Sequence, residues 1–305
     1  MKSSLFPTLK NYKKEYLGKD IAAGIMIAAV SIPISMGYAE VSGLPAVFGL
    51  YGSVLPILFF ALFSTSPQFI FGVDAAPAAI AGAALASLGI EGGSADALQY
   101  IPVIALFVGL WLLLFYFLKA GKLVTFISTP VMGGFISGIA LTIILMQIPK
   151  ILGGKAGSGE LPELIRHIAQ TGKEINWLSV ILGAGALILL RVAGKMIPKF
   201  PMAIVIMALG MIATMVFHVD RYGVILLAKV EPGLPKFILP DIFHVDLSHA
   251  AGRGLMIAVV VMAETLLSEN NFAAKNGYKI DDNKEILACA AGNIVSALTG
   301  SCPVN

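Results

Sequence analysis

A carboxyl group and a hydroxyl group stand four residues apart in a long apolar stretch, at Glu264 and Ser268. Residues four apart lie on the same face of an α-helix. An ionised carboxylate in the middle of a membrane costs roughly 3 kcal/mol, so such a side chain is protonated, paired or functional. The two groups could hold a cation, or the carboxylate could carry a proton. Alternatively, Glu264 lies at the end of its span and water solvates it.

A second acidic residue, Asp74, stands where an apolar stretch opens after the polar interruption 64–68. A helix that begins there, inside the membrane, would aim free N–H groups and a partial positive charge inward, which suits an anion. We expect Asp74 to be the N-cap of this half-helix. Pro33 predicts another break, in the first apolar stretch, because proline removes a backbone donor. Alternatively, Gly and Pro are simply more frequent in membrane helices.

Few other residues could do chemistry. Tyr38 could lend a hydroxyl group to a site, although aromatic residues at membrane interfaces are common. His244, Asp246 and His249 are spaced like metal ligands, but we interpret them as part of a solvated loop. No nucleophile elbow, phosphate loop or zinc-protease motif is present, so nothing indicates an enzyme.

The composition explains why so few polar groups remain. Of 305 residues, 57% are hydrophobic and 13% are charged, with a mean hydropathy of +0.87. Soluble domains carry about a quarter charged residues. This excludes a soluble enzyme, a nucleic-acid-binding protein and a disordered chain. The sequence predicts an all-α, polytopic membrane protein in contact with the lipid bilayer.

The apolar stretches predict nine membrane spans, since crossing a bilayer takes about 20 apolar residues. They lie near residues 21–39, 45–63, 73–89, 98–118, 124–147, 177–192, 201–218, 254–270 and 284–299. With nine spans, most of the 21 Lys and Arg residues fall on one side if the N-terminus is cytoplasmic. The positive-inside rule therefore favours that orientation, in the cell (inner) membrane.

Two segments in the chain resemble each other. Gly24–Val30 is similar to Gly254–Val260, and the predicted spans place the two copies in opposite directions. Inverted repeats are typical of secondary transporters. The alignment puts Ile34 opposite Glu264, although chance similarity between apolar segments is an alternative.

Taken together, the motifs of the chain resemble the SulP anion permeases, solute carrier family 26. The residues that carry the resemblance are Tyr12–Leu17, Ile32–Ala39, Gly43–Pro45, Gly49–Tyr51, Ser66–Ala76, Ser128–Phe135, Gln147–Pro149, Glu264, Ala273–Lys275, Glu285–Leu287, Gly292–Asn293 and Gly300–Val304. Three residues depart from the family pattern: Ile34 stands where relatives often have Gln or Glu, Pro67 where many have Arg, and Val73 where Pro is usual.

The resemblance implies a seven-plus-seven inverted-repeat (UraA-like) fold, in which a core and a gate domain move against each other like an elevator. It implies an anion site between half-helices three and ten. The implied anion-binding residues are Ile34, Tyr38, Val73, Asp74, Ala75 and Ala76. The implied residues for the coupling ion are Glu264 and Ser268. We therefore expect secondary active transport of sulfate or bicarbonate coupled to a proton or a sodium ion, with no other cofactor.

The resemblance also predicts how the chain is divided. Residues 1–20 form a cytoplasmic N-terminal segment, 21–218 the first repeat of seven spans, 219–253 an extracytoplasmic loop, and 254–305 the start of the second repeat. We expect the chain to be a fragment that ends before half-helix ten and a cytoplasmic STAS domain. A nucleobase–cation symporter of the same fold, an anion channel and a non-transporting fragment are alternatives, and a homodimer is possible.

Overall fold

The computed structural model describes residues 5–10, 12–122, 129–155, 157, 161–197, 202–226 and 233–305. Within these ranges the chain is helical. The α-helices are α1 (Leu17–Val41), α2 (Ala46–Gly52), α3 (Leu55–Phe63), α4 (Ala75–Ser87), α5 (Ala95–Phe117), α6 (Thr129–Ile151), α7 (Leu161–Thr171), α8 (Trp177–Met196), α9 (Met202–Phe217), α10 (Leu247–Asn276) and α11 (Asp282–Leu298). This confirms the all-α fold predicted from the sequence.

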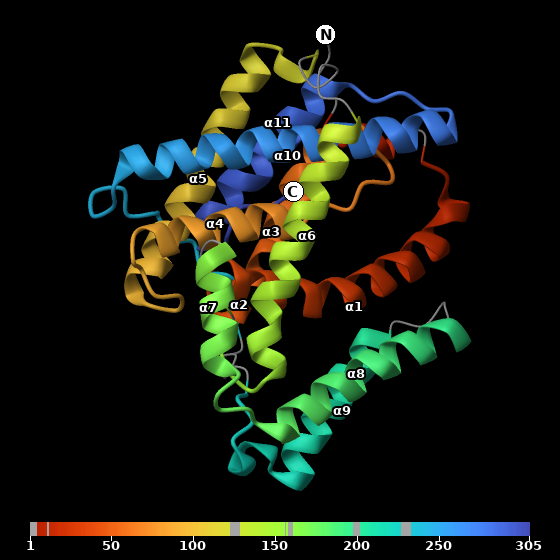
Figure 1. Cartoon of the computed structure of the whole chain (residues 1–305). Helices are drawn as coiled ribbons and strands as arrows, with labels where there is room; N and C mark the ends of the chain where they lie inside the picture. Colours follow the sequence, from red (N-terminus) through yellow and green to blue (C-terminus); the bar gives the residue numbers. More distant parts are fainter. Residues whose placement is uncertain are drawn as a thin grey trace.

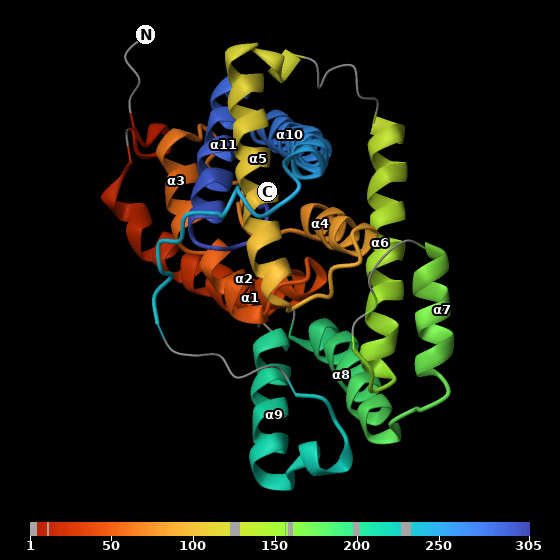
Figure 2. The ribbon, with the colours of Figure 1, turned by 90° about the vertical axis from the view of Figure 1, so that its left-hand side faces the viewer.

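The tightest packing is between α5, α10 and α11, with α3 and α4 against them. Ile101, Ile104 and Leu112 of α5 are fully buried there. Gly109 allows α5 to approach α11 closely, because a Cβ atom at this position would lie 2.6 Å from the side chain of Ile294. By contrast, α8 and α9 lie together at one end of the molecule, beyond α6 and α7 (Figures 1 and 2).

Helix α4 begins inside the molecule. Its 13 residues span about 20 Å, which is less than the ~30 Å hydrocarbon core of a membrane. Just before it, Val73 forms an antiparallel bridge with Val304, and Gly72 exchanges two backbone hydrogen bonds of 2.9 Å with Asn305. The end of the chain therefore lies in the middle of the molecule, next to α4 (Figures 1 and 2). The half-helix expected at the third span is present.

The helices are interrupted at other places than expected in the first two predicted spans. The break predicted at Pro33 was wrong, because α1 continues through this residue to Val41. One missing N–H costs a 25-residue helix a single internal hydrogen bond. The second predicted span instead divides at Ser53 into α2 and α3. At this break the Ser53 hydroxyl donates a hydrogen bond to the backbone carbonyl of Gly49 at 3.0 Å. It also contacts the Ser35 hydroxyl at 2.6 Å.

The helix that contains the eighth predicted span, α10, also begins earlier than expected. The predicted loop to residue 253 was too long, because α10 begins at Leu247. Asp246 caps it by accepting hydrogen bonds from the N–H of His249 at 3.0 Å and the hydroxyl of Ser248 at 2.7 Å. A further helix, α7, lies in the long loop after the fifth span, and residues 124–128 of that span lie outside the described ranges.

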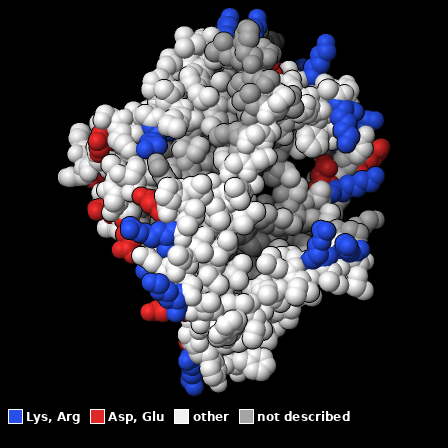
Figure 3. All heavy atoms as spheres, viewed as in Figure 1, with Lys and Arg blue, Asp and Glu red and all other residues white. Residues whose placement is uncertain are grey.

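Five helical segments of the described residues are long and apolar enough to cross a membrane: Lys14–Val41, Ala46–Phe63, Ala95–Phe117, Trp177–Met196 and Leu247–Asn276. Three shorter apolar segments lie in α4, α6 and α9. In Figure 3 the charged side chains gather at the margins of the visible face and leave a broad area without them. Such a surface suits a hydrocarbon environment better than water.

Candidate functional site

A cavity of about 1210 Å³ opens between α1, α4, α6 and α10. All eight residues proposed from the sequence line it: Ile34, Tyr38, Val73, Asp74, Ala75, Ala76, Glu264 and Ser268. They come from three places in the chain: α1, the start of α4 with the two residues before it, and α10. The structure thus brings the candidate residues together, and the binding role of each stays a prediction.

The first turn of α4 faces this cavity without a side-chain cap. Asp74 occupies the N-cap position as expected, but the expected capping bond is wrong, because its side chain accepts no hydrogen bond from the helix. The N–H groups of Ala75 and Ala76 have no partners within the helix, since they belong to its first turn. Pro77, which follows, has no N–H. These two donors and the helix dipole are available to a ligand.

The side-chain amide of Asn305 contacts both acidic residues of the cavity. Its side-chain nitrogen Nδ2 lies 3.2 Å from Glu264 Oε2 and 3.5 Å from Asp74 Oδ2. The hydroxyl of Thr265 donates to the amide oxygen of Asn305. That bond fixes the orientation of the amide, so its nitrogen points at the carboxylates. A single amide therefore links α4 to α10 at the site.

Asn305 was not among the site residues predicted from the sequence. The segment Gly300–Val304 contributed only to the family resemblance. A polar residue that directly follows an apolar run and a proline, Pro303, is the one signal that could have pointed to it. Its partners lie 231 and 41 positions away in the chain, so the pairing itself cannot be read from local spacing.

The charges that line the cavity are acidic. Among the described residues, Asp74 and Glu264 line it, and no Lys, Arg or His does. Two ionised carboxylates on one amide repel each other and repel an anion at the α4 N-terminus. A proton or a bound cation between them removes that repulsion. Ser268, one turn after Glu264, supplies a hydroxyl oxygen next to such a position.

The histidine and aspartate residues near 244–249 do not gather into a metal site. His244 Nδ1 contacts Asp241 at 2.6 Å, whereas His249 contacts Tyr100 and, at 3.3 Å, Ser87. No group of three or more metal-ligating side chains occurs in the part of the chain that the structure describes. The interpretation as a solvated loop was wrong for His249, because it lies in the first turn of α10.

These contacts lower the pKa values of two carboxyl groups outside the spans. The hydrogen bond from His244 lowers the pKa of Asp241. The backbone N–H of His249 lowers the pKa of Asp246, which is the N-cap of α10. Both side chains are therefore more acidic than an ordinary aspartate, because each hydrogen bond favours the ionised form.

A model of the sulfate permease family matches residues 17–305 of the chain. The chain belongs to this family. A probable sulfate transporter of Mycobacterium tuberculosis is 30% identical over 299 residues, which is 97% of this chain and 53% of the relative. The chloroplastic sulfate transporter 4.1 of Arabidopsis thaliana is 29% identical over 98% of this chain and 45% of the relative. The chain thus spans about half the length of the curated relatives that it matches. Membership also agrees with a transporter rather than an enzyme.

Solved structures share the fold. The chain matches the transmembrane domain of a cyanobacterial bicarbonate transporter, BicA, with a TM-score of 0.81 and 23% identity, over 96% of this chain and 75% of the other. It matches murine solute carrier 26 family member A9, described in the inward-facing state, with a TM-score of 0.86 and 18% identity, over 99% of this chain and 54% of the other. Both matches confirm the predicted UraA-like transporter architecture.

Proposed function

We propose that the protein to which this chain belongs carries a small inorganic anion, sulfate or bicarbonate, across a membrane by secondary active transport. The observation that carries the proposal is the uncapped N-terminus of α4, which opens into a large cavity. Free N–H groups and the helix dipole favour an anion there. The substrate class comes from the relatives, which include a probable sulfate transporter and a bicarbonate transporter.

Glu264 and Ser268 hold the coupling ion in this proposal. Glu264 shares the amide of Asn305 with Asp74, so it is close to the anion-binding turn without contacting the same N–H groups. A proton or a sodium ion at Glu264 neutralises the carboxylate that would otherwise repel the anion. Binding of the cation and of the anion is thereby favourable only together, which is the requirement for coupled transport.

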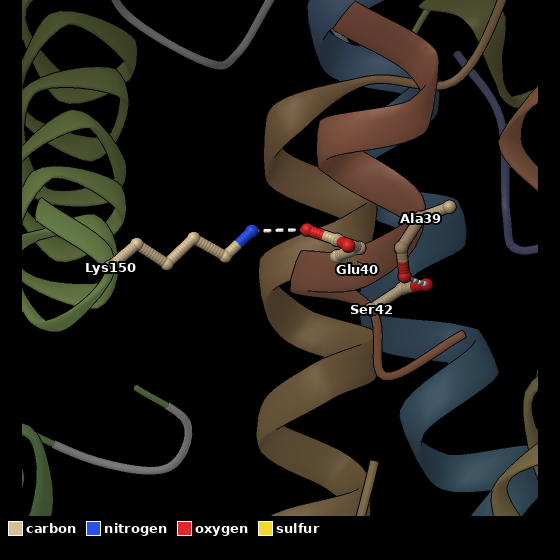
Figure 4. Close-up of polar contacts among 4 residues, drawn as sticks. All are labelled: Ala39, Glu40, Ser42 and Lys150. Carbon is tan, nitrogen blue, oxygen red and sulfur yellow. Dashed lines mark hydrogen bonds and ion pairs between the residues drawn. The ribbon is translucent and has the colours of Figure 1, made fainter. Parts of the chain in front are cut away.

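We also propose that two groups of helices move against each other in an elevator-like way. One group is built around α5, α10 and α11, includes α1 to α4 and carries most of the site, and the other contains α6 to α9. Lys150 of α6 forms an ion pair with Glu40 at the end of α1, across the two groups (Figure 4). A partly exposed ion pair contributes little stability, so it can break and re-form during movement. The orientation with a cytoplasmic N-terminus in the inner membrane, and a homodimer, are part of the same proposal.

Uptake of radiolabelled sulfate and bicarbonate into proteoliposomes tests the function. We expect the unsubstituted protein to accumulate one of the two anions when a proton or sodium gradient is imposed. Glu264→Gln is expected to reduce gradient-driven uptake by about tenfold or more, because it removes a charge that acts in the coupled step. Glu91→Gln is the matched control, since the side chain of Glu91 is exposed and lies outside the cavity.

The outcomes separate the parts of the proposal. Uptake by the unsubstituted protein that needs no gradient would contradict coupled transport. Unchanged gradient-driven uptake in Glu264→Gln, with normal insertion into the membrane, would contradict the role of Glu264. Comparison of sodium and proton gradients at fixed membrane potential identifies the coupling ion.

A further inference from the structure

A second, smaller cavity of about 240 Å³ lies beside the first one. It is bounded by α10 and by the segment between α3 and α4, and it shares Phe69, Ile70 and Ser268 with the large cavity. Its other polar lining includes Ser66 and Glu269. The volume is enough for several water molecules, each of which occupies about 30 Å³. The cavity is therefore a chamber next to the candidate anion site.

Two fully buried carboxyl groups lie next to each other, and one of them, Glu269, lines this chamber. Glu269 of α10 and Glu285 of α11 are each 0% exposed, and their carboxyl groups are close enough to interact directly. No described Lys, Arg or His forms an ion pair with either of them. The other titratable groups that face the pair are Asp282 and the Cys289 thiol on α11. Two buried negative charges in contact, without a cation, are strongly unfavourable.

The hydrogen bonds of Thr65 distinguish the two carboxyl groups. The Thr65 N–H donates to Glu285 Oε1 at 2.6 Å, and the Thr65 hydroxyl donates to the same oxygen. The Thr65 hydroxyl oxygen in turn accepts the N–H of Asp281 at 2.9 Å. Its single proton is therefore committed to Glu285. Two donors on one oxygen stabilise the ionised form of Glu285.

The remaining oxygen atoms lack donors. Glu269 Oε1, Glu269 Oε2 and Glu285 Oε2 are buried, and no described group donates a hydrogen bond to them. A carboxyl proton on Glu269 that is donated to Glu285 satisfies the contact between the two groups. It also leaves a single negative charge in the pair. Carboxylate pairs in contact commonly share one proton for this reason.

Ser66 gives an independent indication that the chamber holds a polar occupant. Its hydroxyl oxygen is buried, the residue is 6% exposed, and the hydroxyl has no hydrogen-bond partner among the described groups. It lines the same chamber as Glu269. A buried hydroxyl without a partner costs about 1–3 kcal/mol, so water in the chamber is favoured. Such water would connect Glu269 to Ser268 and to the large cavity.

We propose that Glu269 and Glu285 form a proton-binding site, separate from Glu264, that exchanges its proton with the anion cavity through water in the chamber. The proton moves from a water molecule to a carboxylate oxygen of Glu269, where an O–H bond forms and the water keeps the electron pair. Glu285 stays ionised and accepts the hydrogen bond. Release reverses these steps and returns the proton to water.

Infrared spectroscopy of the protein in liposomes tests the site directly. At neutral pH we expect a carbonyl stretching band of a protonated carboxyl group, which shifts when the water is replaced by D₂O. Glu269→Gln is expected to remove this band and to keep the melting temperature, since the glutamine amide can still donate to Glu285. Glu264→Gln and Glu91→Gln are expected to keep it.

Two results would overturn the proposal. One is a set of carboxyl bands that is the same in Glu269→Gln and in the unsubstituted protein. The other is a Glu269 band that does not shift in D₂O, because such a proton would not exchange with the cavity. If Glu269→Gln does not fold, Glu269→Asp gives the same decision, because an aspartic acid in place of the glutamic acid is expected to change the frequency of the band, and an unchanged band would overturn the proposal.

The measurement does not depend on transport. A protein that takes up neither sulfate nor bicarbonate, but loses the band in Glu269→Gln, contradicts the proposed function and supports the proton site. A protein that transports an anion and shows no exchangeable Glu269 band supports the function and contradicts the site.

Discussion

At the scale of single residues, one amide determines how the acidic groups of the cavity are arranged. Asn305 donates toward both Asp74 and Glu264, while Thr265 holds its oxygen. An amide can do this because it has two N–H groups on one side and an acceptor on the other. Its neutrality matters as much as its geometry, since a third negative charge would be repelled by the other two.

Asn305→Asp is expected to lower the melting temperature at neutral pH and to weaken anion uptake, because it places three carboxylates together. The melting temperature is expected to recover partly as the pH is lowered, when protons neutralise the cluster. Thermal unfolding of the detergent-solubilised protein at several pH values measures this. Asn293→Asp, on α11, is a poor control because Asn293 also donates hydrogen bonds in the core; Asn276→Asp at the exposed end of α10 is suitable. A melting temperature equal to that of the unsubstituted protein at neutral pH would contradict the prediction.

The residues of the site were predictable where their chemistry was unusual for their surroundings. A carboxyl group within a membrane span, at Glu264, stands out in any apolar sequence, and all eight proposed residues line one cavity. Glu269 was missed, although it is also a carboxyl group in the same helix. Only the structure shows that it is fully buried and meets Glu285, because that contact depends on how α10 packs against α11.

At the scale of elements, close helix approaches depend on glycine. A Cβ atom on Gly82 of α4 would lie 2.2 Å from the backbone carbonyl oxygen of Val41 at the end of α1. A backbone atom cannot move aside as a flexible side chain can. This contact fixes α4 against α1, the helix that carries Ile34 and Tyr38.

Gly82→Ala is therefore expected to destabilise the protein by about 1–3 kcal/mol, the usual cost of overpacking. Gly185→Ala on α8 is the matched control, because nothing lies within 4 Å of a Cβ atom there. That change is expected to be neutral or slightly stabilising, since alanine favours helices more than glycine does. Equal melting temperatures for the two variants would show that α1 and α4 do not approach as closely as described.

The N-cap of α10 carries a pH-dependent contribution to stability. The pKa of Asp246 is lowered in the folded protein by the N–H of His249 and the hydroxyl of Ser248. A group whose pKa is lower when folded stabilises the protein above its unfolded pKa, and this stabilisation is lost as the pH falls through the folded pKa. Asp246→Ala is expected to lower the melting temperature at neutral pH and to have a smaller effect in acid. A difference from the unsubstituted protein that stays constant with pH would exclude this role, and Asp241→Ala separates it from the neighbouring contact with His244.

The positions of most helices followed from hydrophobic length alone, but their ends did not. Pro33 signalled a break that a long helix absorbs, whereas the division between α2 and α3 was missed although Pro56, in the first turn of α3, could have indicated a helix start. A serine can satisfy backbone groups locally, as Ser53 does with Gly49. Whether a proline or a serine breaks a helix thus depends on partners from other helices, such as Ser35.

At the scale of the whole molecule, Glu40 and Lys150 link the group of helices that carries the site to the group that contains α6 (Figure 4). Both side chains are partly exposed, so their ion pair is worth about 1 kcal/mol or less. The pair matters for its position more than for its contribution to stability, because it joins the ends of α1 and α6.

Lys150→Glu places two negative charges together and is expected to lower the melting temperature and slow anion uptake. The exchange of both charges, Glu40→Lys with Lys150→Glu, is expected to restore most of both losses, because it rebuilds the pair in reverse. A double-mutant cycle on melting temperature and uptake measures the coupling between the two residues. Losses in the double variant equal to the sum of the single losses would show that the pair does not link the two groups.

The bridge between Val73 and Val304 has a consequence for biosynthesis. Helix α4 is made early, but the backbone partner of Val73, just before this helix, is made 231 residues later. Until residue 304 has emerged from the ribosome, the acidic groups at the start of α4 have no amide from Asn305 and Gly72 has no backbone partner. Contacts of such long sequence separation form late in folding. A nascent chain that has not yet reached this residue therefore lacks part of the lining of the candidate site, and the cavity takes the form described only after Asn305 has been made.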